Sequence, residues 1–132
     1  MTIAVRYYSR SGKTKTVADT IAGATGVEAI PVDAPNAALA NHVDVLFVGG
    51  ALYAYGLDKH LSSYLGALDA NMVGKAVLFS TSWLSKHALD LMRTALESKG
   101  IAVEDETLYL RSGAVDSAEA QVREFATRHA DE

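Results

Sequence analysis

The chain has 132 residues, a formal net charge of −4 and no cysteine. Its length is that of one domain, and the lack of cysteine excludes disulfides, thiolate metal sites and cysteine nucleophiles. It has no run of Lys or Arg typical of a nucleic-acid binder, and no apolar stretch near the ~20 residues that span a bilayer. We therefore expect one soluble, cytoplasmic domain over residues 1–132, with no nucleic-acid partner and no stable membrane insertion.

The first half of the chain alternates short apolar runs with stretches of helical periodicity. The predicted elements are strands over 3–8, 27–32 and 43–48 and a helix over 13–24. Gly26 is suited to end that helix in a left-handed conformation. Pro31 removes a donor from the second strand, which places this strand at an edge of the sheet.

The second half continues the alternation. The predicted elements are a helix from 57 to 68, a strand over 76–79, a helix over 88–96, a strand within 101–110 and a last helix from 118. Gly100 is expected to end the third helix, and 116–119 resembles a capping box for the last one. The fifth strand is the most polar, which indicates an edge position.

A strand followed by a helix, repeated five times, predicts a parallel sheet with right-handed crossovers. Five units are too few to close an eight-stranded barrel, so we expect an α/β three-layer sandwich with helices on both faces of an open sheet. Ligands of such sheets bind outside the carboxyl ends of the strands. The loops over 9–13, 49–56 and 80–85 are therefore the candidate binding loops.

The first of these loops has the composition of a phosphate cradle. Three hydroxyls surround one glycine, and free amides of a helix N-terminus follow. The candidate residues are Ser9, Arg10, Ser11, Gly12, Lys13 and Thr14. An alternative is that Ser9 or Ser11 only caps the helix, and that the two cations point to solvent.

Two nucleotide-binding motifs can be excluded for this loop. The sequence Gly12-Lys13-Thr14 resembles the end of a nucleotide-binding P-loop, but Tyr7 stands where that motif needs its first glycine. The dinucleotide fingerprint G-x-G-x-x-G is absent. An ATPase, a GTPase and a Rossmann-type NAD or FAD site are therefore not expected.

The second and third loops offer aromatic rings for a planar ligand. The candidates of the second loop are Ala51, Leu52, Tyr53, Ala54, Tyr55 and Gly56, and those of the third are Thr81, Ser82 and Trp83. Either tyrosine could instead pack on the following helix, and Trp83 could be a core residue. The sequence does not decide which of these rings stacks on a ligand.

The motif Ser9-x-Ser11-Gly12-x-Thr14 directly after the first strand resembles the phosphate loop of the flavodoxin family. The stretch GGALYAYG and the later FSTS resemble loops of short flavodoxin-like proteins, a group that includes menaquinone-dependent protoporphyrinogen oxidase. The chain lacks the long insertion of the porphyrin-oxidising members, so that substrate is not expected. The resemblance implies a flavodoxin-like fold with strand order 2-1-3-4-5 and non-covalent FMN as the cofactor.

Electron transfer with a redox partner protein is the leading function that the resemblance implies. The alternatives are a small FMN-dependent oxidoreductase that acts on a quinone or similar acceptor, and a flavin-free interaction domain. The four histidines are not spaced as metal ligands, so no metal site is predicted. Asp58, Lys59 and His60 are expected to be solvated at the start of a helix. The sequence does not predict the oligomeric state.

Overall fold

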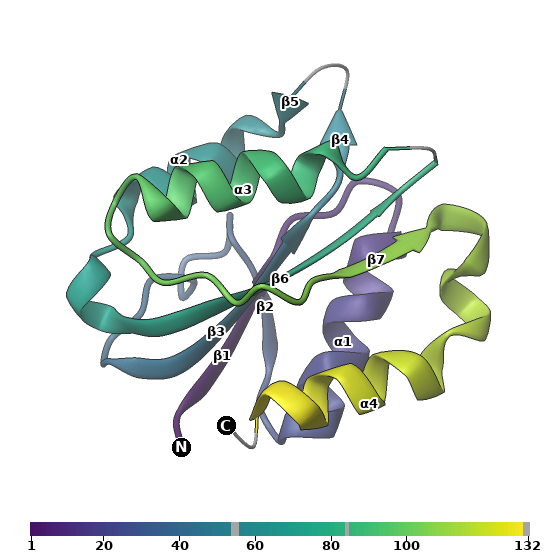
Figure 1. Cartoon of the computed structure of the whole chain (residues 1–132), viewed down its shortest axis with the longest axis horizontal. Coiled ribbons are helices and arrows are strands. Elements are labelled where there is room, and N and C mark those ends of the chain that lie inside the picture. The colour runs from purple at the N-terminus through teal and green to yellow at the C-terminus, as the bar shows by residue number, and fades with distance from the viewer. Residues whose placement is uncertain (54–55, 84, 131–132) are drawn as a thin grey trace.

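The computed structural model describes residues 1–53, 56–83 and 85–130. Five parallel strands form the main sheet in the order β2-β1-β3-β6-β7. These strands are β1 (Ile3–Tyr7), β2 (Ala29–Pro31), β3 (Val43–Gly50), β6 (Val73–Ser82) and β7 (Leu108–Arg111). Counted within this sheet alone, the order is 2-1-3-4-5, so the predicted sandwich, strand order and two edge strands are confirmed (Figure 1).

Helices cover both faces of the sheet (Figure 1). They are α1 (Lys13–Thr25), α2 (Lys59–Ala67), α3 (His87–Glu97) and α4 (Glu119–Ala130), with short 3₁₀ helices at Ala70–Met72 and Ser112–Ser117. Helices α1 and α4 lie on one face, and α2 and α3 lie on the other. Within the described residues, no helix has the length and apolar character needed to cross a membrane.

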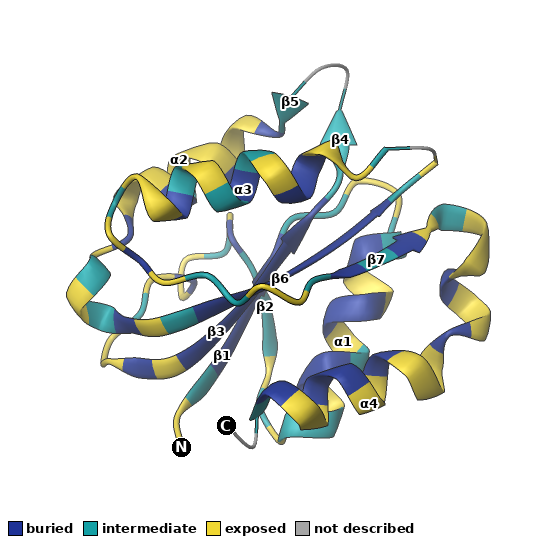
Figure 2. Ribbon diagram, viewed as in Figure 1, coloured by how far each residue is buried: buried dark blue, intermediate teal, exposed yellow. Residues whose placement is uncertain are grey.

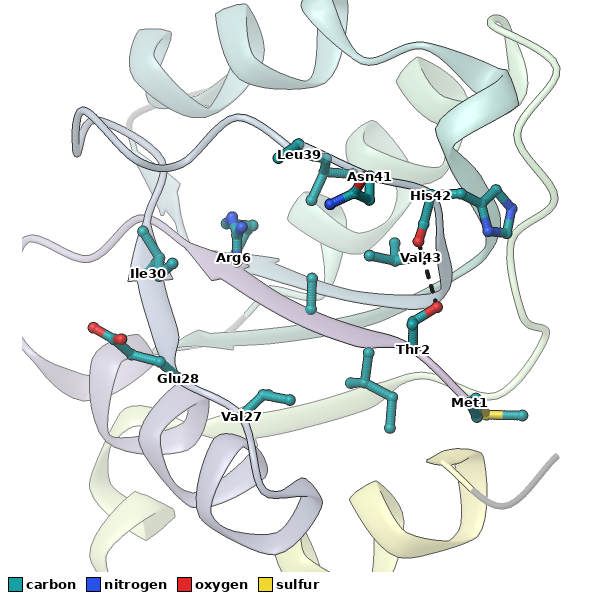
Figure 3. A pocket seen from close by; sticks show the side chains of 13 residues that line it. Met1, Thr2, Arg6, Val27, Glu28, Ile30, Leu39, Asn41, His42 and Val43 are labelled. Carbon is teal, nitrogen blue, oxygen red and sulfur yellow. Dashed lines mark hydrogen bonds between the residues drawn. The ribbon is translucent and has the colours of Figure 1, made fainter.

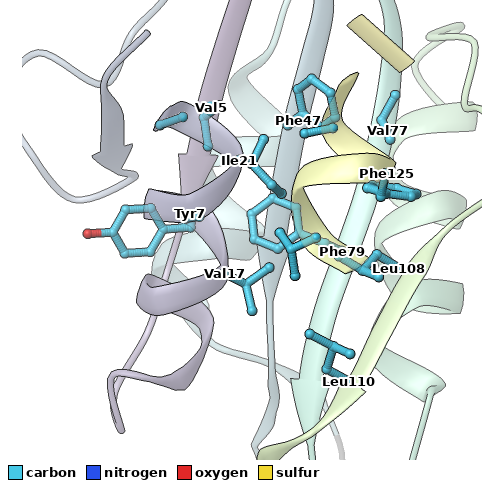
Figure 4. Close-up of a cluster of buried hydrophobic side chains, with 14 of the residues drawn as sticks. Val5, Tyr7, Val17, Ile21, Phe47, Val77, Phe79, Leu108, Leu110 and Phe125 are labelled. Atoms are coloured by element: carbon cyan, nitrogen blue, oxygen red, sulfur yellow. The ribbon is translucent and has the colours of Figure 1, made fainter. Parts of the chain in front are cut away.

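The core consists of two apolar layers, one on each face of the sheet. Successive side chains of a strand point to opposite faces, so Phe47 packs toward α1 and α4, whereas Leu46 and Val48 pack toward α2 and α3. Figure 4 shows the first layer, where Ile21 of α1 and Phe125 of α4 lie against the sheet. The central strands are buried along most of their length (Figure 2), as their continuous apolar runs predict.

Two predicted helix ends are confirmed by left-handed glycines. Gly26 follows α1 with φ 78° and its amide donates to the carbonyl of Ala22. Gly100, with φ 84°, lies just after the end of α3. The predicted capping box is wrong, because Asp116 lies within the second 3₁₀ helix and Ala118 accepts the first hydrogen bond of α4.

The predicted fivefold repeat of strand and helix fails between β2 and β3. Residues 32–42, which connect them, contain no helix. Pro35 and Asn36 interrupt this segment, and the six residues that remain are fewer than a typical helix needs. The segment is held instead at the carbonyl of Ala37, which accepts hydrogen bonds from Arg6 (2.7 Å) and Tyr64 (2.7 Å).

Two candidate loops contain more regular structure than expected. The second loop forms an antiparallel pair of short strands, β4 (Leu52–Tyr53) and β5 (Gly56–Leu57). Strand β6 runs on through Ser82, because its polar end pairs with β7. Thr81 and Ser82 therefore belong to a strand rather than a loop.

Candidate functional site

The three candidate loops meet at the carboxyl ends of β1, β3 and β6. Thr14 Oγ1 at the start of α1 lies 2.7 Å from Thr81 Oγ1 at the end of β6. The backbone amide of Arg10 donates to the hydroxyl of Tyr53 at 3.0 Å. The first loop thus contacts both of the others, and the fold places the three segments side by side, as the parallel topology predicts.

The first loop is built around a left-handed glycine. Gly12 has φ 91° and is the N-cap of α1, and no side chain caps this helix end. Its amide donates to Ser9 Oγ at 3.0 Å, and the amide of Lys13 donates to Ser11 Oγ at 3.4 Å. The N-cap residue is Gly12 rather than either serine, although both serine hydroxyls accept from amides at this helix end. The first-turn amides have no partner within the helix, which suits an anion.

The hydroxyls of Thr14 and Thr81 form a buried pair at the base of this loop. Thr14 is 1% exposed and Thr81 is 2% exposed. Each hydroxyl carries one proton, and the bond between them uses only one. The other proton remains able to donate to a ligand in the first loop.

The two cations of the first loop pair with carboxylates. The guanidinium of Arg10 binds Asp58, with Nε 3.1 Å from Oδ2, and lies over the ring of Tyr53 at 3.9 Å from its centroid. Lys13 Nζ lies 3.5 Å from a carboxylate oxygen of the exposed Asp116. Both side chains are partly exposed, but their ion pairs hold them near the loop, so they do not simply extend into solvent.

Asp58 is buried, contrary to the prediction that it is solvated. It caps α2, and its Oδ1 accepts from the amide of His60 at 2.7 Å and lies 2.9 Å from His60 Nδ1. Burial raises the pKa of Asp58, but the hydrogen bonds from Arg10 and His60 outweigh it and lower the pKa to about 2. The ring of His60 also stacks on Tyr8 with centroids 5.1 Å apart. Asp58 therefore ties the first loop to α2.

The second loop contributes one aromatic ring among the described residues. Ala51, Leu52, Tyr53 and Gly56 are half-buried, whereas Ala54 and Tyr55 lie outside the described residues. The hydrogen bond of Tyr53 and its cation contact both go to Arg10, so its ring faces the first loop. Burial raises the pKa of Tyr53, opposed by the amide and the charge of Arg10.

The third loop ends in an exposed tryptophan. Trp83 is 77% exposed, so the alternative that it belongs to the core is wrong. It lines a cavity of about 370 Å³ together with Arg111, Gly113 and Ala114. Ser82 Oγ lies 3.2 Å from the hydroxyl of Tyr109 on β7, which fixes the strand end beside it.

One buried polar atom at this edge lacks a partner. Ser80 Oγ, on β6 directly before Thr81, has no hydrogen-bond partner among the described residues. Unpaired buried hydroxyls are costly, and they are expected where a ligand or water completes the bonding. Within the same part of the chain, no group of three His, Asp or Glu side chains is placed to hold a metal ion.

The edge thus combines two kinds of surface. Hydroxyls, amides and two cations gather at the first loop, and Tyr53 and Trp83 belong to the two loops that follow the next strands of the sheet, β3 and β6. This arrangement suits a ligand with a phosphate at one end and a flat aromatic system at the other. Asp58, Tyr109 and Arg111 were not predicted to belong to this site, because the residues that they contact are distant in sequence. The only available signal was the position of Asp58 directly before a helix, which is typical of a capping residue.

Comparison with known proteins agrees with this description. The profile of a family described as "Flavodoxin domain" matches residues 4–126. No curated protein matches the chain. Among solved structures, oxidised flavodoxin 2 from Bacillus cereus is similar with a TM-score of 0.80 and 19% identity, over 99% of both chains.

Two further structures share the fold. A flavodoxin from the domain Archaea has a TM-score of 0.76 and 20% identity, with 99% of this chain and 97% of that chain covered. Rubredoxin oxygen:oxidoreductase from Desulfovibrio gigas has a TM-score of 0.81 and 13% identity. In that protein the match covers 98% of this chain but 35% of the longer one, so the shared fold is one part of a larger molecule.

Proposed function

The chain belongs to the flavodoxin-domain family, whose cofactor is FMN and whose function is electron transfer, and we propose that its first loop holds the FMN phosphate. The observation that carries the proposal is the uncapped N-terminus of α1 behind the left-handed Gly12. Amides at such a helix end donate to an anion, and the helix dipole favours its charge. Ser9, Ser11 and Thr14 supply hydroxyls to the same loop.

The cations of the loop add to this preference for a phosphate. Arg10 and Lys13 stay close to the loop through their pairs with Asp58 and Asp116. Asp58 is held ionised by Arg10 and His60, so it neutralises the guanidinium and keeps it in place over Tyr53. We propose that Arg10 orients this loop and that Lys13 contributes the larger share of net positive charge.

The flavin ring is proposed to lie between the second and third loops. When bound, FMN supplies the capacity to accept electrons and pass them on. Tyr53 and Trp83 would flank the ring, and Thr81 and Ser82 would form the strand end beside its edge. Ala51, Leu52, Ala54, Tyr55 and Gly56 complete the proposed set. The unpaired hydroxyl of Ser80 supports a polar ligand group or water close to this edge.

The test is the visible absorption spectrum of the purified protein, followed by titration of the flavin-free form with FMN and riboflavin. We expect a yellow protein that binds FMN at least roughly 100-fold more tightly, because riboflavin lacks the phosphate. Equal affinity for the two ligands would overturn the role of the first loop. A protein that takes up neither would support the alternative of a flavin-free interaction domain.

We further propose that the redox partner presents an acidic surface. The side chains around Trp83 are basic, since Arg111 lines the same cavity and Lys86 lies over the ring of Tyr109. Among the acids of this region, Asp58 pairs with Arg10, Asp116 pairs with Lys13, and Asp90 lies 3.9 Å from His87 Nδ1. The local charge therefore has the opposite sign to the net charge of −4, and local charge steers encounters.

The salt dependence of a small redox reaction distinguishes local charge from net charge. The probe that separates the two is the anion ferricyanide: we expect its oxidation of the reduced protein to slow as salt is added, because screening weakens attraction to the basic rim. Lys86→Glu with Arg111→Glu should remove this salt dependence, whereas Lys99→Glu, beyond the other end of α3, should leave it. A rate that rises with salt in the unchanged protein would contradict the proposal.

One observation favours the second candidate function, oxidation or reduction of a small quinone-like acceptor. The ring of His60 is held by Asp58 through Nδ1, and its Nε2 has no hydrogen bond among the described residues. Such a ring can donate a proton to an acceptor. Steady turnover of a soluble benzoquinone, lost in His60→Gln, would support this function. The cytoplasmic location stays a prediction, to be checked by cell fractionation.

A further inference from the structure

One hollow of the described structure lies far from the three loops. A cavity of about 470 Å³ opens at the amino end of the sheet, lined by the start of β1, by β2 and by the residues that lead into β3 (Figure 3). The proposed FMN site lies at the carboxyl ends of the same strands. The cavity is therefore a separate place on the molecule, and its volume is within the range of about 300–1,000 Å³ typical of small-molecule sites.

The cavity exists because the connection between β2 and β3 lacks a helix. Strand β2 is only three residues long, Ala29–Pro31, and the segment 32–42 crosses above the sheet as a loop. This loop touches β1 at the carbonyl of Ala37, and its last residues, from Leu39 to His42, line the cavity beside the start of the strand.

One buried cation lies in this cavity. Arg6 is 7% exposed, and Figure 3 places it between Ile30 and Leu39. Its Nε donates to the carbonyl of Ala37 at 2.7 Å and its Nη1 to the carbonyl of Val5 at 3.1 Å. No carboxylate forms an ion pair with it among the described residues. A buried charge without a counter-charge is unfavourable, and a guanidinium has donors for an anion beyond these two carbonyls.

The remaining walls select the kind of anion. Ile30, Leu39 and Val43 are aliphatic, and the one aromatic ring among the lining residues is the half-exposed imidazole of His42. The exposed Glu28 lies at its rim, where its charge would oppose a dianion more strongly than a monoanion. We infer that the cavity binds a small aliphatic monocarboxylate, with its carboxylate on Arg6 and its hydrocarbon chain against these aliphatic walls.

The test compares ligands on the FMN-loaded, ¹⁵N-labelled protein. Octanoate should shift the amide resonances of Ile30 and Leu39 and bind at least tenfold more tightly than the neutral octanamide. Equal affinity of octanoate and octanamide would overturn the role of Arg6. Phosphate binding as tight as octanoate would overturn the role of the apolar walls, and shifts confined to residues 9–14 would place the carboxylate in the first loop and overturn the site.

Variants provide a second test. Arg6→Met should weaken octanoate binding at least tenfold, and Arg123→Met, on the exposed side of α4, should have no effect. If Arg6→Met fails to fold, Ala40→Trp takes its place, since Ala40 is exposed and lines the cavity. Retained FMN binding in either variant shows that the fold is intact, and octanoate binding that survives Ala40→Trp would contradict the inference.

Discussion

The two ends of the sheet carry different kinds of polar feature. At the carboxyl end, hydroxyls, helix amides, cations and aromatic rings come from three loops that follow β1, β3 and β6. At the amino end, a single buried guanidinium, that of Arg6, lies among aliphatic side chains. The first arrangement follows from the parallel topology, which gathers strand ends on one edge. The second depends on a departure of this chain from that topology, the missing helix between β2 and β3.

The largest expected effect comes from removing hydroxyls at the carboxyl end. In Ser11→Ala with Thr14→Ala, two donors to the FMN phosphate are lost, each worth about 1.5–3 kcal/mol with a charged acceptor. We expect the affinity for FMN to fall by roughly 100-fold or more, measured by titration of the flavin-free protein.

The matched control for this variant is Thr20→Ala with Ser62→Ala. Thr20 donates only to its own helix at Thr16, and Ser62 is exposed on α2. FMN affinity should be unchanged in the control, and octanoate binding at the amino end should be unchanged in both. Unchanged FMN affinity in the double variant of the first loop would show that these hydroxyls do not bind the FMN phosphate, and the carboxyl end would no longer be distinguished as the phosphate site.

Asp58 gives the carboxyl end a dependence on acid. Its pKa is about 2 in the folded chain and near 4 when unfolded, so the folded state favours its ionised form. The stability that this adds, roughly 2 kcal/mol, is present above about pH 4 and is lost as the pH falls toward 2. Asp58→Asn keeps a side chain that caps α2, so it tests the charge alone.

The measurement is urea unfolding from pH 7 down to pH 2. We expect the variant to be less stable at pH 7 and to lose less stability on acidification than the unchanged protein. Parallel curves for the two proteins would contradict the role of the carboxylate. Arg6 has no carboxylate partner among the described residues, so the guanidinium itself adds no acid-sensitive ion pair to the cavity.

The next largest expected effect is a loss of stability when Gly12, in the first loop, is replaced. Its φ of 91° disfavours any side chain, although a Cβ there would meet no atom within 4 Å. Gly12→Ala should therefore destabilise the fold by about 1–2 kcal/mol through backbone strain alone. Gly66→Ala is the matched control, since Gly66 lies within α2 with open space around it, and alanine there should stabilise. Equal unfolding midpoints for the two variants would rule out strain at Gly12.

The sequence predicted the parts of the fold that depend on local pattern. Strand β1 and helix α1 were placed within one residue of their ends, because apolar periodicity and a left-handed glycine are local properties. The end of β6 was missed, because Ser80 and Ser82 are polar and their strand conformation comes from pairing with β7 and, for Ser80, also with β3. Such pairing joins residues almost thirty positions apart and leaves no local pattern.

The candidate site divides in the same way. The hydroxyls and glycine of the first loop are contiguous, so their pattern could be read from the sequence. The bond between Arg10 and Asp58 spans 48 positions, so neither this pair nor the burial of Asp58 leaves a local pattern in the sequence. The sequence did not indicate a site at Arg6. A cation within a strand is ordinary, and Arg6 becomes notable only because the structure surrounds it with aliphatic side chains.

Replacing Trp83 is expected to have the smallest effect on stability. Its fluorescence also tests whether the two ends of the sheet bind their ligands independently. This residue is 77% exposed, so Trp83→Ala should change the free energy of unfolding by less than about 0.5 kcal/mol. It is also the sole tryptophan, so its fluorescence reports only on the third loop. We expect FMN to quench this fluorescence in step with its binding, and octanoate to leave it unchanged, because Arg6 lies at the opposite end of the strands. If FMN binds without quenching, the flavin ring is not beside Trp83; if octanoate quenches, the two ends are not independent sites.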